Sequence, residues 1–476
     1  MKLSQRIVTN ALALSVSHIV CRIISFLLVL AIARHYATEL FGQYIFALSF
    51  VELFMVLADL GIAKLTVRSV AQSPEDTGKL LGIIGTLKLL YTGCTLVLIV
   101  IFLMILNYHP HVVKLTLIFS VRSACDSLFD LFVSVFKGRQ RMYYIPPFNI
   151  GTTLIAVSLC FVCLRLDMPI VAIALVFMGA SFLKVCIGSI IVFKTFAGPV
   201  FNFTVRTLFA YAKMAIPFGL GSVFVRIFTR IDTVMLSKLT TMTIVGCYNA
   251  AYNLVIVLLF LPGAFNDAVF PAMSRFHKTS DKDFSVTFER LFKYSMLIGI
   301  PMAVGISALA DRFVLLFYGA RYAEAIVPLR ILGWLMATTF GTYAFTTTLN
   351  ASHREKLVTV TVLFCSIINI VLNVFFIPRW QHIGASVSTL LTEWLFFGMS
   401  CFFVRKYVVK TNVVRYIIRP ALASAGMYGV IYYLKSYTII CPIAGGIATY
   451  CIMIVLLRTL DATDITLLKN LFIKKK

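Results

Sequence analysis

Six basic side chains lie inside apolar stretches that are long enough to cross a bilayer. They are Arg22, Lys88, Arg122, Lys184, Arg226 and Arg230. A charge at that depth is costly, so each is a candidate functional group by default. Arginine offers paired donors that match phosphate oxygens, and basic residues in this setting therefore predict binding of an anionic substrate. The alternative for the arginines is neutralisation by a nearby carboxylate, with a role in packing only. Lys88 could instead extend its side chain towards the cytoplasmic end of its helix.

Carboxylates lie in the same apolar stretches. Four of them are candidates for taking up and releasing a coupling ion: Glu52, Asp59, Asp130 and Glu393. A carboxylate in apolar surroundings is suited to proton exchange near neutral pH. Glu52 and Asp59 are seven residues apart and share one helix face. Arg122, Asp126 and Asp130 also share a face, and there the spacing favours an Arg122–Asp126 ion pair that leaves Asp130 unexplained.

The composition identifies the elements that must position these groups. Of the 476 residues, 60% are hydrophobic and 13% are charged, with a mean hydropathy of +0.94. Only lipid can cover so much apolar surface, so the sequence predicts an integral membrane protein with many spans. The net charge of +24 would indicate nucleic acid in a soluble protein,. Here it is explained by Lys and Arg in cytoplasmic loops, and no nucleic-acid partner is expected.

The apolar runs predict an all-α fold with fourteen spans. They cover 12–33, 42–63, 80–106, 112–136, 146–166, 170–193, 211–236, 245–270, 292–310, 326–349, 355–377, 384–404, 417–434 and 438–458. A β-barrel is excluded because the runs are continuous rather than alternating. With the N-terminus inside, 28 of the 43 Lys and Arg residues fall on the cytoplasmic side, nine on the other and six within spans. This bias predicts that both termini are cytoplasmic.

An internal repeat relates the two halves of the chain. Sliding the sequence by 204 residues superposes Arg22-Ile23 on Arg226-Ile227 and Gly42-x-Tyr44 on Gly246-x-Tyr248. Spans 1–2 fall on spans 7–8, which predicts a parallel repeat. We expect an N-terminal lobe at 1–206, a C-terminal lobe at 207–410 and two additional spans with a basic tail at 411–476. We interpret the two Gly-x-Tyr motifs as turn markers at the outer ends of the spans.

Three stretches carry a family resemblance. They are AIARHYATELFGQYIFALSFVELFMVLADLGIAKLTVR, RIDTVMLSKLTTMTIVGCYNAAYNL and NIVLNVFFIPRWQHIGASVSTLLTE. The chain resembles the polysaccharide flippases, which include O-antigen and capsular repeat-unit translocases and are related to lipid II flippases and multidrug-extrusion transporters. The resemblance implies two six-helix lobes around a central cavity and alternating access. It implies flipping of a polyprenyl-(pyro)phosphate-linked oligosaccharide in the cytoplasmic membrane, with membrane lipid, a polysaccharide polymerase and chain-length machinery as partners.

No motif for another chemistry is present. The sequence lacks a GxxxxGK[ST] phosphate loop, an HExxH motif and a nucleophile elbow, so no enzyme activity and no cofactor are expected,. Cys160 and Cys163 form a CxxC without a second ligand pair and are interpreted as small packing residues. Two alternatives stay open: a multidrug-extrusion-type exporter, and a membrane polymerase or ligase that acts on the lipid-linked glycan. The six basic residues within spans favour an anionic substrate over cationic drugs.

Overall fold

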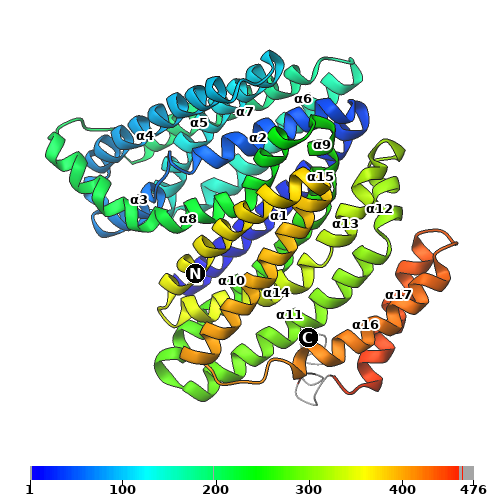
Figure 1. The fold of residues 1–476 in the computed structure, drawn as a ribbon. Coiled ribbons are helices and arrows are strands. Elements are labelled where there is room, and N and C mark those ends of the chain that lie inside the picture. Colours follow the sequence, from blue (N-terminus) through cyan, green and yellow to red (C-terminus); the bar gives the residue numbers. More distant parts are fainter. Residues whose placement is uncertain (1–2, 197, 460–463, 465–476) are drawn as a thin grey trace. The chain divides into compact units, whose positions relative to one another are not determined.

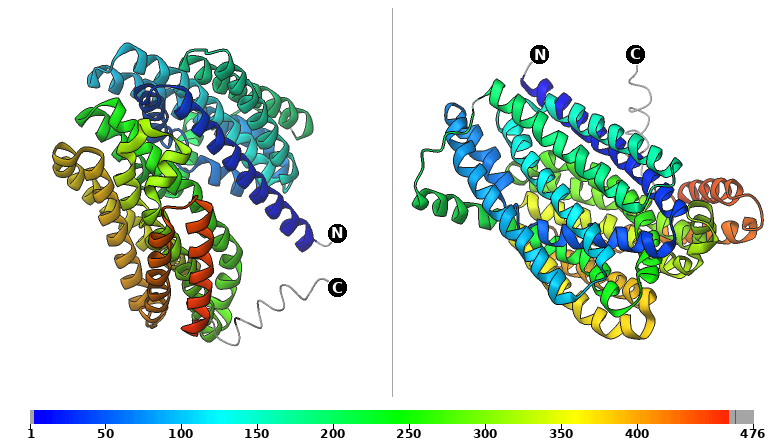
Figure 2. Two further views of the ribbon diagram at one scale, coloured as in Figure 1. Left: turned by 90° about the vertical axis from the view of Figure 1, so that its right-hand side faces the viewer. Right: turned by 90° about the horizontal axis from the view of Figure 1, so that it is seen from above.

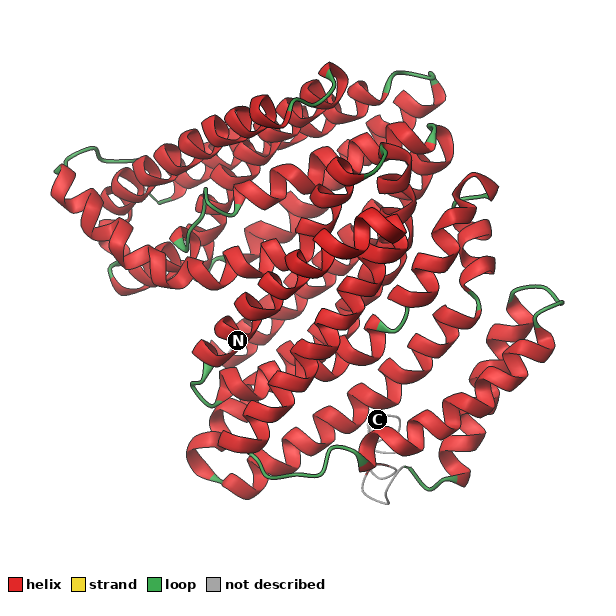
Figure 3. Ribbon diagram, viewed as in Figure 1, coloured by secondary structure: helices red, strands yellow, loops and turns green. Residues whose placement is uncertain are grey.

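Helices make up almost the whole of the described chain. The computed structural model describes residues 3–196, 198–459 and 464. Within these ranges the chain forms helices joined by short loops, and it contains no strand (Figure 3). The predicted all-α fold is confirmed.

The helices follow one another in the order of the colours in Figure 1. The first eight are α1 (Leu3–His35), α2 (Thr38–Met55), α3 (Ile62–Gln72), α4 (Thr77–Leu106), α5 (Pro110–Gly138), α6 (Ile145–Arg165), α7 (Ile170–Thr195) and α8 (Val205–Leu239). The remaining ones are α9 (Met242–Ile256), α10 (Phe260–Thr279), α11 (Asp281–Ala308), α12 (Ala310–Phe317), α13 (Ile326–Leu332), α14 (Leu335–Ala351), α15 (Glu355–Tyr407), α16 (Arg415–Leu434) and α17 (Ile440–Leu456).

The helices group into two compact units. Unit 1 comprises Met1–Asn249 and Val362–Ala385, and unit 2 comprises Ala250–Thr361 and Ser386–Lys476. Each unit has its own buried interior. The lobes expected at 1–206 and 207–410, with the addition at 411–476, stay a prediction.

Length and apolarity qualify many of these helices as membrane spans. Seven described helices meet both conditions, and the bent pair Ala320–Leu332 and Leu335–Ala351, with an angle of 42°, is an eighth candidate. The helix α5 has 29 residues but carries three charged groups near its middle, Arg122, Asp126 and Asp130. Each of the fourteen predicted ranges falls on one helix or on two consecutive helices.

The long helix α15 contains two of the predicted spans. At 53 residues it would be roughly 80 Å long if straight, far more than the ~30 Å hydrocarbon core of a bilayer,. Its backbone breaks at Gln381, where φ is 50° and ψ is −127°. A Cβ on Gly384 would lie only 2.3 Å from the carbonyl oxygen of Phe376, so the chain turns back on itself there. The spans at 355–377 and 384–404 are thus the two limbs of α15.

The helix boundaries reproduce the internal repeat. α1 ends at His35 and α8 at Leu239, while α2 begins at Thr38 and α9 at Met242. Both separations are 204 residues, the offset found in the sequence. The second helix of each repeat also ends at a similar distance from its start. α2 ends at a turn before α3, and α9 ends at the 3₁₀ turn Val257–Leu259. The repeat therefore extends from residue identities to the boundaries between the helices.

The two repeated glycines mark a close helix crossing in unit 1. A Cβ on Gly42 would lie 1.8 Å from the carbonyl oxygen of Met242, and one on Gly246 would lie 2.5 Å from that of Thr38. The contacts are reciprocal, because Thr38 and Met242 precede their glycines by four residues. The interpretation of these glycines as turn markers is wrong. Both lie inside helices, and glycine is needed there because the two backbones leave no room for a side chain.

The interiors of the two units differ. In unit 1, α5 packs against α2, α3, α4 and α7, and α4, α5 and α7 run side by side in Figures 1 and 2. In unit 2, α11 packs against α14 and α16, and α16 lies beside α17 (Figure 2). The rings of Phe292 and Phe345 lie 5.0 Å apart there, and Phe397 lies 5.2 Å from Phe345. These rings form the aromatic interior of unit 2.

Candidate functional site

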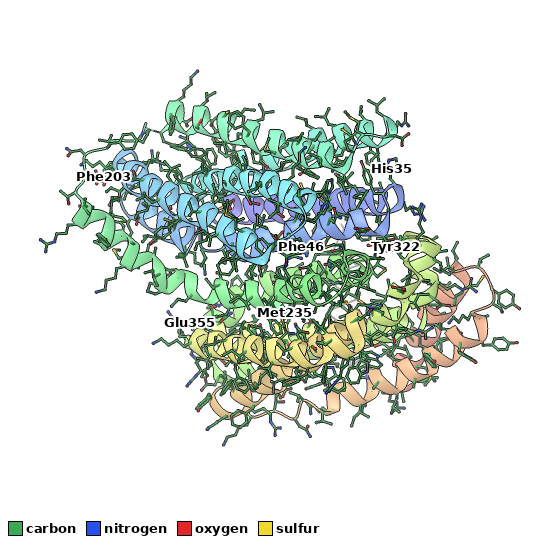
Figure 4. The ribbon with its side chains drawn as sticks, turned by 45° about the horizontal axis from the view of Figure 1, so that its top comes forward. His35, Phe46, Phe203, Met235, Tyr322 and Glu355 are labelled. Atoms are coloured by element: carbon green, nitrogen blue, oxygen red, sulfur yellow. The ribbon has the colours of Figure 1, made fainter. Side chains whose placement is uncertain are left out.

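A carboxylate on α2 holds two arginines of α8. Oε2 of Glu52 accepts hydrogen bonds from Nη1 of Arg226 at 3.0 Å and from Nε of Arg230 at 2.8 Å. The arginines are four residues apart, so they lie on one face of α8 and reach the same oxygen. We call these three residues the Glu52 cluster, and its net charge is positive. Figure 4 labels Phe46 on α2 and Met235 on α8, the two helices that carry this cluster.

The side chains of the Glu52 cluster are accessible. The exposed fractions are 37% for Glu52, 44% for Arg226 and 23% for Arg230. Charged groups facing lipid at this depth would be very unfavourable, so these side chains must border water or a polar ligand. Arg22 on α1 is also exposed, and among the described residues it has no carboxylate partner. Arg22, Arg226 and Arg230 therefore retain donors for an anion.

Lys88 on α4 is enclosed by protein. Its Nζ lies 2.7 Å from Oδ1 of Asp59, and its side chain is 1% exposed. Asp59 sits in the turn between α2 and α3, next to Leu60 and Gly61, whose φ angles are 34° and 86°. The ion pair connects this turn to α4. The alternative of a Lys88 side chain that extends towards the cytoplasmic end of its helix is therefore wrong, because the ammonium is buried against Asp59.

Asp126 on α5 has two basic partners. Nζ of Lys184 on α7 lies 3.0 Å from Oδ1, and Nε of Arg122 lies 3.6 Å from Oδ2. The guanidinium of Arg122 also lies over the ring of Phe177, 4.6 Å from its centroid. The ion pair expected from the Arg122–Asp126 spacing is present, and Lys184 adds a second one.

A polar pocket of about 250 Å³ opens beside Asp126, between α5, α6 and α7. Its lining residues are Asp126, Phe129, Asp130, Val133, Lys137, Ile145, Asn149 and Lys184. The carboxylate of Asp130 is exposed and has no ion pair or side-chain hydrogen bond within the described part of the chain. Asp130 is thus a predicted coupling residue with a free carboxylate at a space large enough for several waters.

Glu393 is the predicted coupling residue in unit 2. It lies on the second limb of α15 and is half-buried. Its Oε2 is buried and has no hydrogen-bond partner among the described residues. An unsatisfied buried oxygen is unusual in a native structure, so Glu393 remains a candidate coupling residue. The assignments of all ten candidate residues stay predictions.

A buried polar cluster on α8, α9 and α15 was not among the predicted sites. Asp232 accepts hydrogen bonds from Tyr248 at 3.0 Å and from Asn373 at 2.6 Å. Asn373 also donates to Asn369 at 3.0 Å. The i, i+4 spacing of Asn369 and Asn373 was the available signal, since amides at that spacing commonly form hydrogen bonds between membrane helices.

Two family models match the chain. Residues 7–277 match the polysaccharide biosynthesis protein family, and residues 147–456 match the lipid II flippase MurJ family. Each match covers more than half of the chain, and together they cover nearly all of it. The two matches together include both halves of the internal repeat, so the family assignment does not depend on one half alone.

Two curated relatives match shorter stretches. The probable low-salt glycan biosynthesis flippase Agl15 of Haloferax volcanii is 23% identical over 188 residues, 39% of this chain and 39% of the relative. The probable flippase AglR of the same organism is 28% identical over 168 residues, 34% of this chain and 35% of the relative. The matched part therefore spans less than two fifths of either relative.

A solved structure supports the fold over nearly the whole length. The lipid II flippase MurJ in an inward closed conformation superposes with a TM-score of 0.77 and 19% identity, covering 93% of this chain and 98% of that chain. At this identity the likeness concerns the fold. The chain is a multi-pass membrane protein of the lipid-linked oligosaccharide and polysaccharide flippase family, within the multidrug/oligosaccharidyl-lipid/polysaccharide exporter superfamily, a family of transporters rather than enzymes.

Proposed function

We propose that the protein flips a polyprenyl-(pyro)phosphate-linked oligosaccharide across the cytoplasmic membrane for the biosynthesis of a surface polysaccharide. Membership of the flippase family supports this function. So does the match to Agl15, whose name assigns it to glycan biosynthesis. In this proposal both termini are cytoplasmic and the glycan leaves the cytoplasmic leaflet.

The observation that carries the proposal is the Glu52 cluster. Each guanidinium has five N–H donors, and one from each arginine is committed to Oε2 of Glu52,. The remaining donors can replace water around phosphate oxygens. Arg22, the repeat equivalent of Arg226, would add a third cation without a carboxylate of its own. A net positive, accessible group of this kind fits a phosphate or pyrophosphate better than a cationic drug.

Glu52 would allow the head group to leave again. In the absence of substrate it occupies donors of Arg226 and Arg230 and so limits the cost of placing two cations side by side. When a phosphate binds, it competes with Glu52 for those donors. Binding is then moderated, as a transporter requires, because tight capture would prevent release.

Among the coupling candidates of unit 1, Asp130 is the carboxylate best suited to the proposed coupling to an ion gradient. Glu52 and Asp59 both have cation partners, whereas Asp130 has none among the described residues. The groups that face it across the pocket are Asp126, Lys137, Asn149 and Lys184. A carboxylate in such a hydrated pocket can exchange a proton without first breaking an ion pair.

Reconstitution tests the binding role directly. The full-length protein is placed in vesicles with a fluorescent polyprenyl-pyrophosphate-linked oligosaccharide, and its arrival on the opposite leaflet is followed. We expect the double variant Arg226→Ala/Arg230→Ala to lose flipping and the matching lysine variant to retain part of it. Lys213→Ala is the control, because Lys213 is an exposed cation on the same helix. Full activity of the double alanine variant at normal insertion would contradict the role of the cluster.

Deletion of the gene in its host tests the substrate class. We expect the lipid-linked oligosaccharide to accumulate on the cytoplasmic leaflet and the surface polysaccharide to decrease. An unchanged surface polysaccharide without any accumulated intermediate would refute the proposed function.

The coupling role needs a separate measurement. In the same vesicles, a proton gradient is imposed and flipping is compared with that in its absence. We expect Asp130→Asn to abolish the gradient-dependent part and to leave lipid binding unchanged. Asp283→Asn is the control, since Asp283 is exposed at the start of α11. A variant that still responds fully to the gradient would remove Asp130 from the coupling mechanism.

A further inference from the structure

A second basic site lies in unit 2, at the end of α15. An open cavity of about 910 Å³ is lined by the last turns of α15 and by the linker to α16. Its polar lining consists of Arg405, Lys406, Lys410, Thr411 and Asn412. The predicted orientation places this end of α15 in the cytoplasm, at the level of the lipid head groups.

Three cations of this cavity have no acidic partner. Among the described residues, Arg405, Lys406 and Lys410 form no ion pair. The nearby Glu289 is engaged elsewhere: its Oε2 lies 3.1 Å from Arg415, and its Oε1 accepts a hydrogen bond from Thr411 at 2.7 Å. The cavity therefore has an uncompensated positive charge, which predicts an anionic ligand.

The cavity has an apolar floor as well as a basic rim. Gly398 and Phe402 line it on the bilayer side of the cations. A Cβ on Gly398 would meet no atom within 4 Å, so the space beside this residue is open. Nζ of Lys406 lies 5.5 Å from the ring centroid of Phe402, which holds the cation at the boundary between the apolar and basic parts.

The apolar floor continues deeper along the same helices. A second pocket of about 200 Å³ has an almost wholly apolar lining that includes Trp394, Phe397 and Ile417. Trp394, Gly398 and Phe402 follow one another at four-residue steps, so they lie along one face of α15. The two pockets thus follow one another along α15, the first with a cationic lining and the second with an apolar one, and together they are here called the α15–α16 groove.

We propose that the α15–α16 groove binds an anionic phospholipid of the bilayer, separately from the transported lipid. The phosphate would contact Arg405, Lys406 and Lys410, and an acyl chain would run past Gly398 towards Trp394. Basic pockets between membrane helices on the cytoplasmic side commonly bind such head groups. The matching of a charged end to an apolar length favours a phospholipid over a free phosphate ion.

Lipid retention by the purified full-length protein tests the proposal. Native mass spectrometry in neutral detergent compares phosphatidylglycerol with phosphatidylcholine, and we expect preferential retention of phosphatidylglycerol. Removing three cations near an anionic head group should weaken binding of phosphatidylglycerol on the order of a hundredfold. We expect this loss of affinity in the triple variant Arg405→Gln/Lys406→Gln/Lys410→Gln. The control is Arg275→Gln/Lys278→Gln/Lys282→Gln, which removes the same charge from exposed positions in unit 2 outside the groove. Unchanged retention by the first variant would overturn the proposal.

A second pair of variants tests the apolar part without changing charge. Gly398→Leu should fill the open space and reduce phosphatidylglycerol retention. Gly429→Leu adds the same side chain to α16 at a position that is equally open and outside the groove, and it should have no effect. Equal behaviour of the two variants would contradict an acyl chain beside Gly398.

Competition identifies the source of the phosphate. Inorganic phosphate and farnesyl pyrophosphate are added to the protein loaded with phosphatidylglycerol. Retention of the phospholipid in both cases supports the proposal. Displacement by inorganic phosphate would indicate a free-anion site, and displacement by farnesyl pyrophosphate alone would indicate a site for the transported lipid. Either displacement would overturn it.

Discussion

Unit 1 and unit 2 are both built from apolar helices, but they bury different chemistry. Unit 1 contains Glu52, Asp59 and Asp126 on or next to apolar helices, each with at least one basic partner. Unit 2 packs the rings of Phe292 and Phe345 against one another. Two of its ion pairs, Asp311–Lys435 and Glu289–Arg415, involve residues at the ends of helices, and a third, Lys293–Asp464, is buried.

The difference separates a responsive interior from a stiff one. Ion pairs can exchange partners when a charged ligand or a proton binds, so the ion pairs of unit 1 can respond to binding of the substrate or of a coupling ion. Buried aromatic rings gain their energy from burial and close contact, and no ligand can replace those contacts. We therefore expect changes to the aromatic rings of unit 2 to alter stability and changes to the ion pairs of unit 1 to alter transport as well.

The largest effect on stability is expected from Phe292→Ala in unit 2. The ring is fully buried, and its removal should lower the free energy of unfolding by about 3–5 kcal/mol,. Chemical denaturation of the purified protein measures this change. Tyr433→Ala is the control, because this side chain is 80% exposed and its loss should be nearly neutral. A small effect of Phe292→Ala would contradict the aromatic interior.

Lys88→Met tests the buried ion pair of unit 1. It leaves the carboxylate of Asp59 without its partner and should cost about 3 kcal/mol, the lower end of the usual range because Asp59 is 36% exposed,. The double variant Lys88→Met/Asp59→Leu should regain most of that stability, since no unpaired charge remains. Normal transport by the double variant would assign the pair to packing, whereas a transport defect in a stable protein would restore its functional role.

Gly42→Ala tests the crossing of α2 and α9. A methyl group there would overlap the carbonyl of Met242, so the helices must separate, at a cost of about 1–3 kcal/mol,. Gly246→Ala strains the same crossing, and we expect the double variant to cost less than the sum of the two single variants. Gly93→Ala in the open part of α4 should be neutral or slightly stabilising in the same denaturation experiment,. Strict additivity would mean that the two glycines do not share one contact.

The smallest effect is expected from Glu52→Gln. The glutamine still accepts a hydrogen bond, but it no longer offsets the charge of Arg226 and Arg230. We expect tighter binding of the lipid-linked substrate and turnover slower on the order of tenfold, with little change in stability. Steady-state flipping at several substrate concentrations separates the two constants. A faster turnover would contradict a role for Glu52 in release.

The sequence predicted the elements better than their contacts. Each of the fourteen continuous apolar runs falls on one helix or on two consecutive helices, because bilayer thickness sets the length of an apolar helix,. Even the break in α15 was expected, since its two runs are separated by the polar residues Arg379, Gln381 and His382. The offset of 204 residues found in the sequence also relates the boundary between α1 and α2 to that between α8 and α9.

The site could be predicted only in part. Residue types identified the charged groups of unit 1, but spacing along the chain cannot pair α2 with α8 or α5 with α7. Glu52 meets Arg226 and Arg230 across more than 170 positions. Gly42 was misinterpreted for a related reason, because a glycine in a turn and a glycine at a helix crossing look alike in sequence.

The crossing of Gly42 and Gly246 also concerns the history of the chain. If the repeat arose by duplication of a gene, the two glycines descend from one ancestral position that now meets its own copy. Each then permits the close crossing that leaves no room for a side chain at the other. In a set of homologues we expect glycine to be kept at both positions or lost at both, so substitutions at the two positions should occur together.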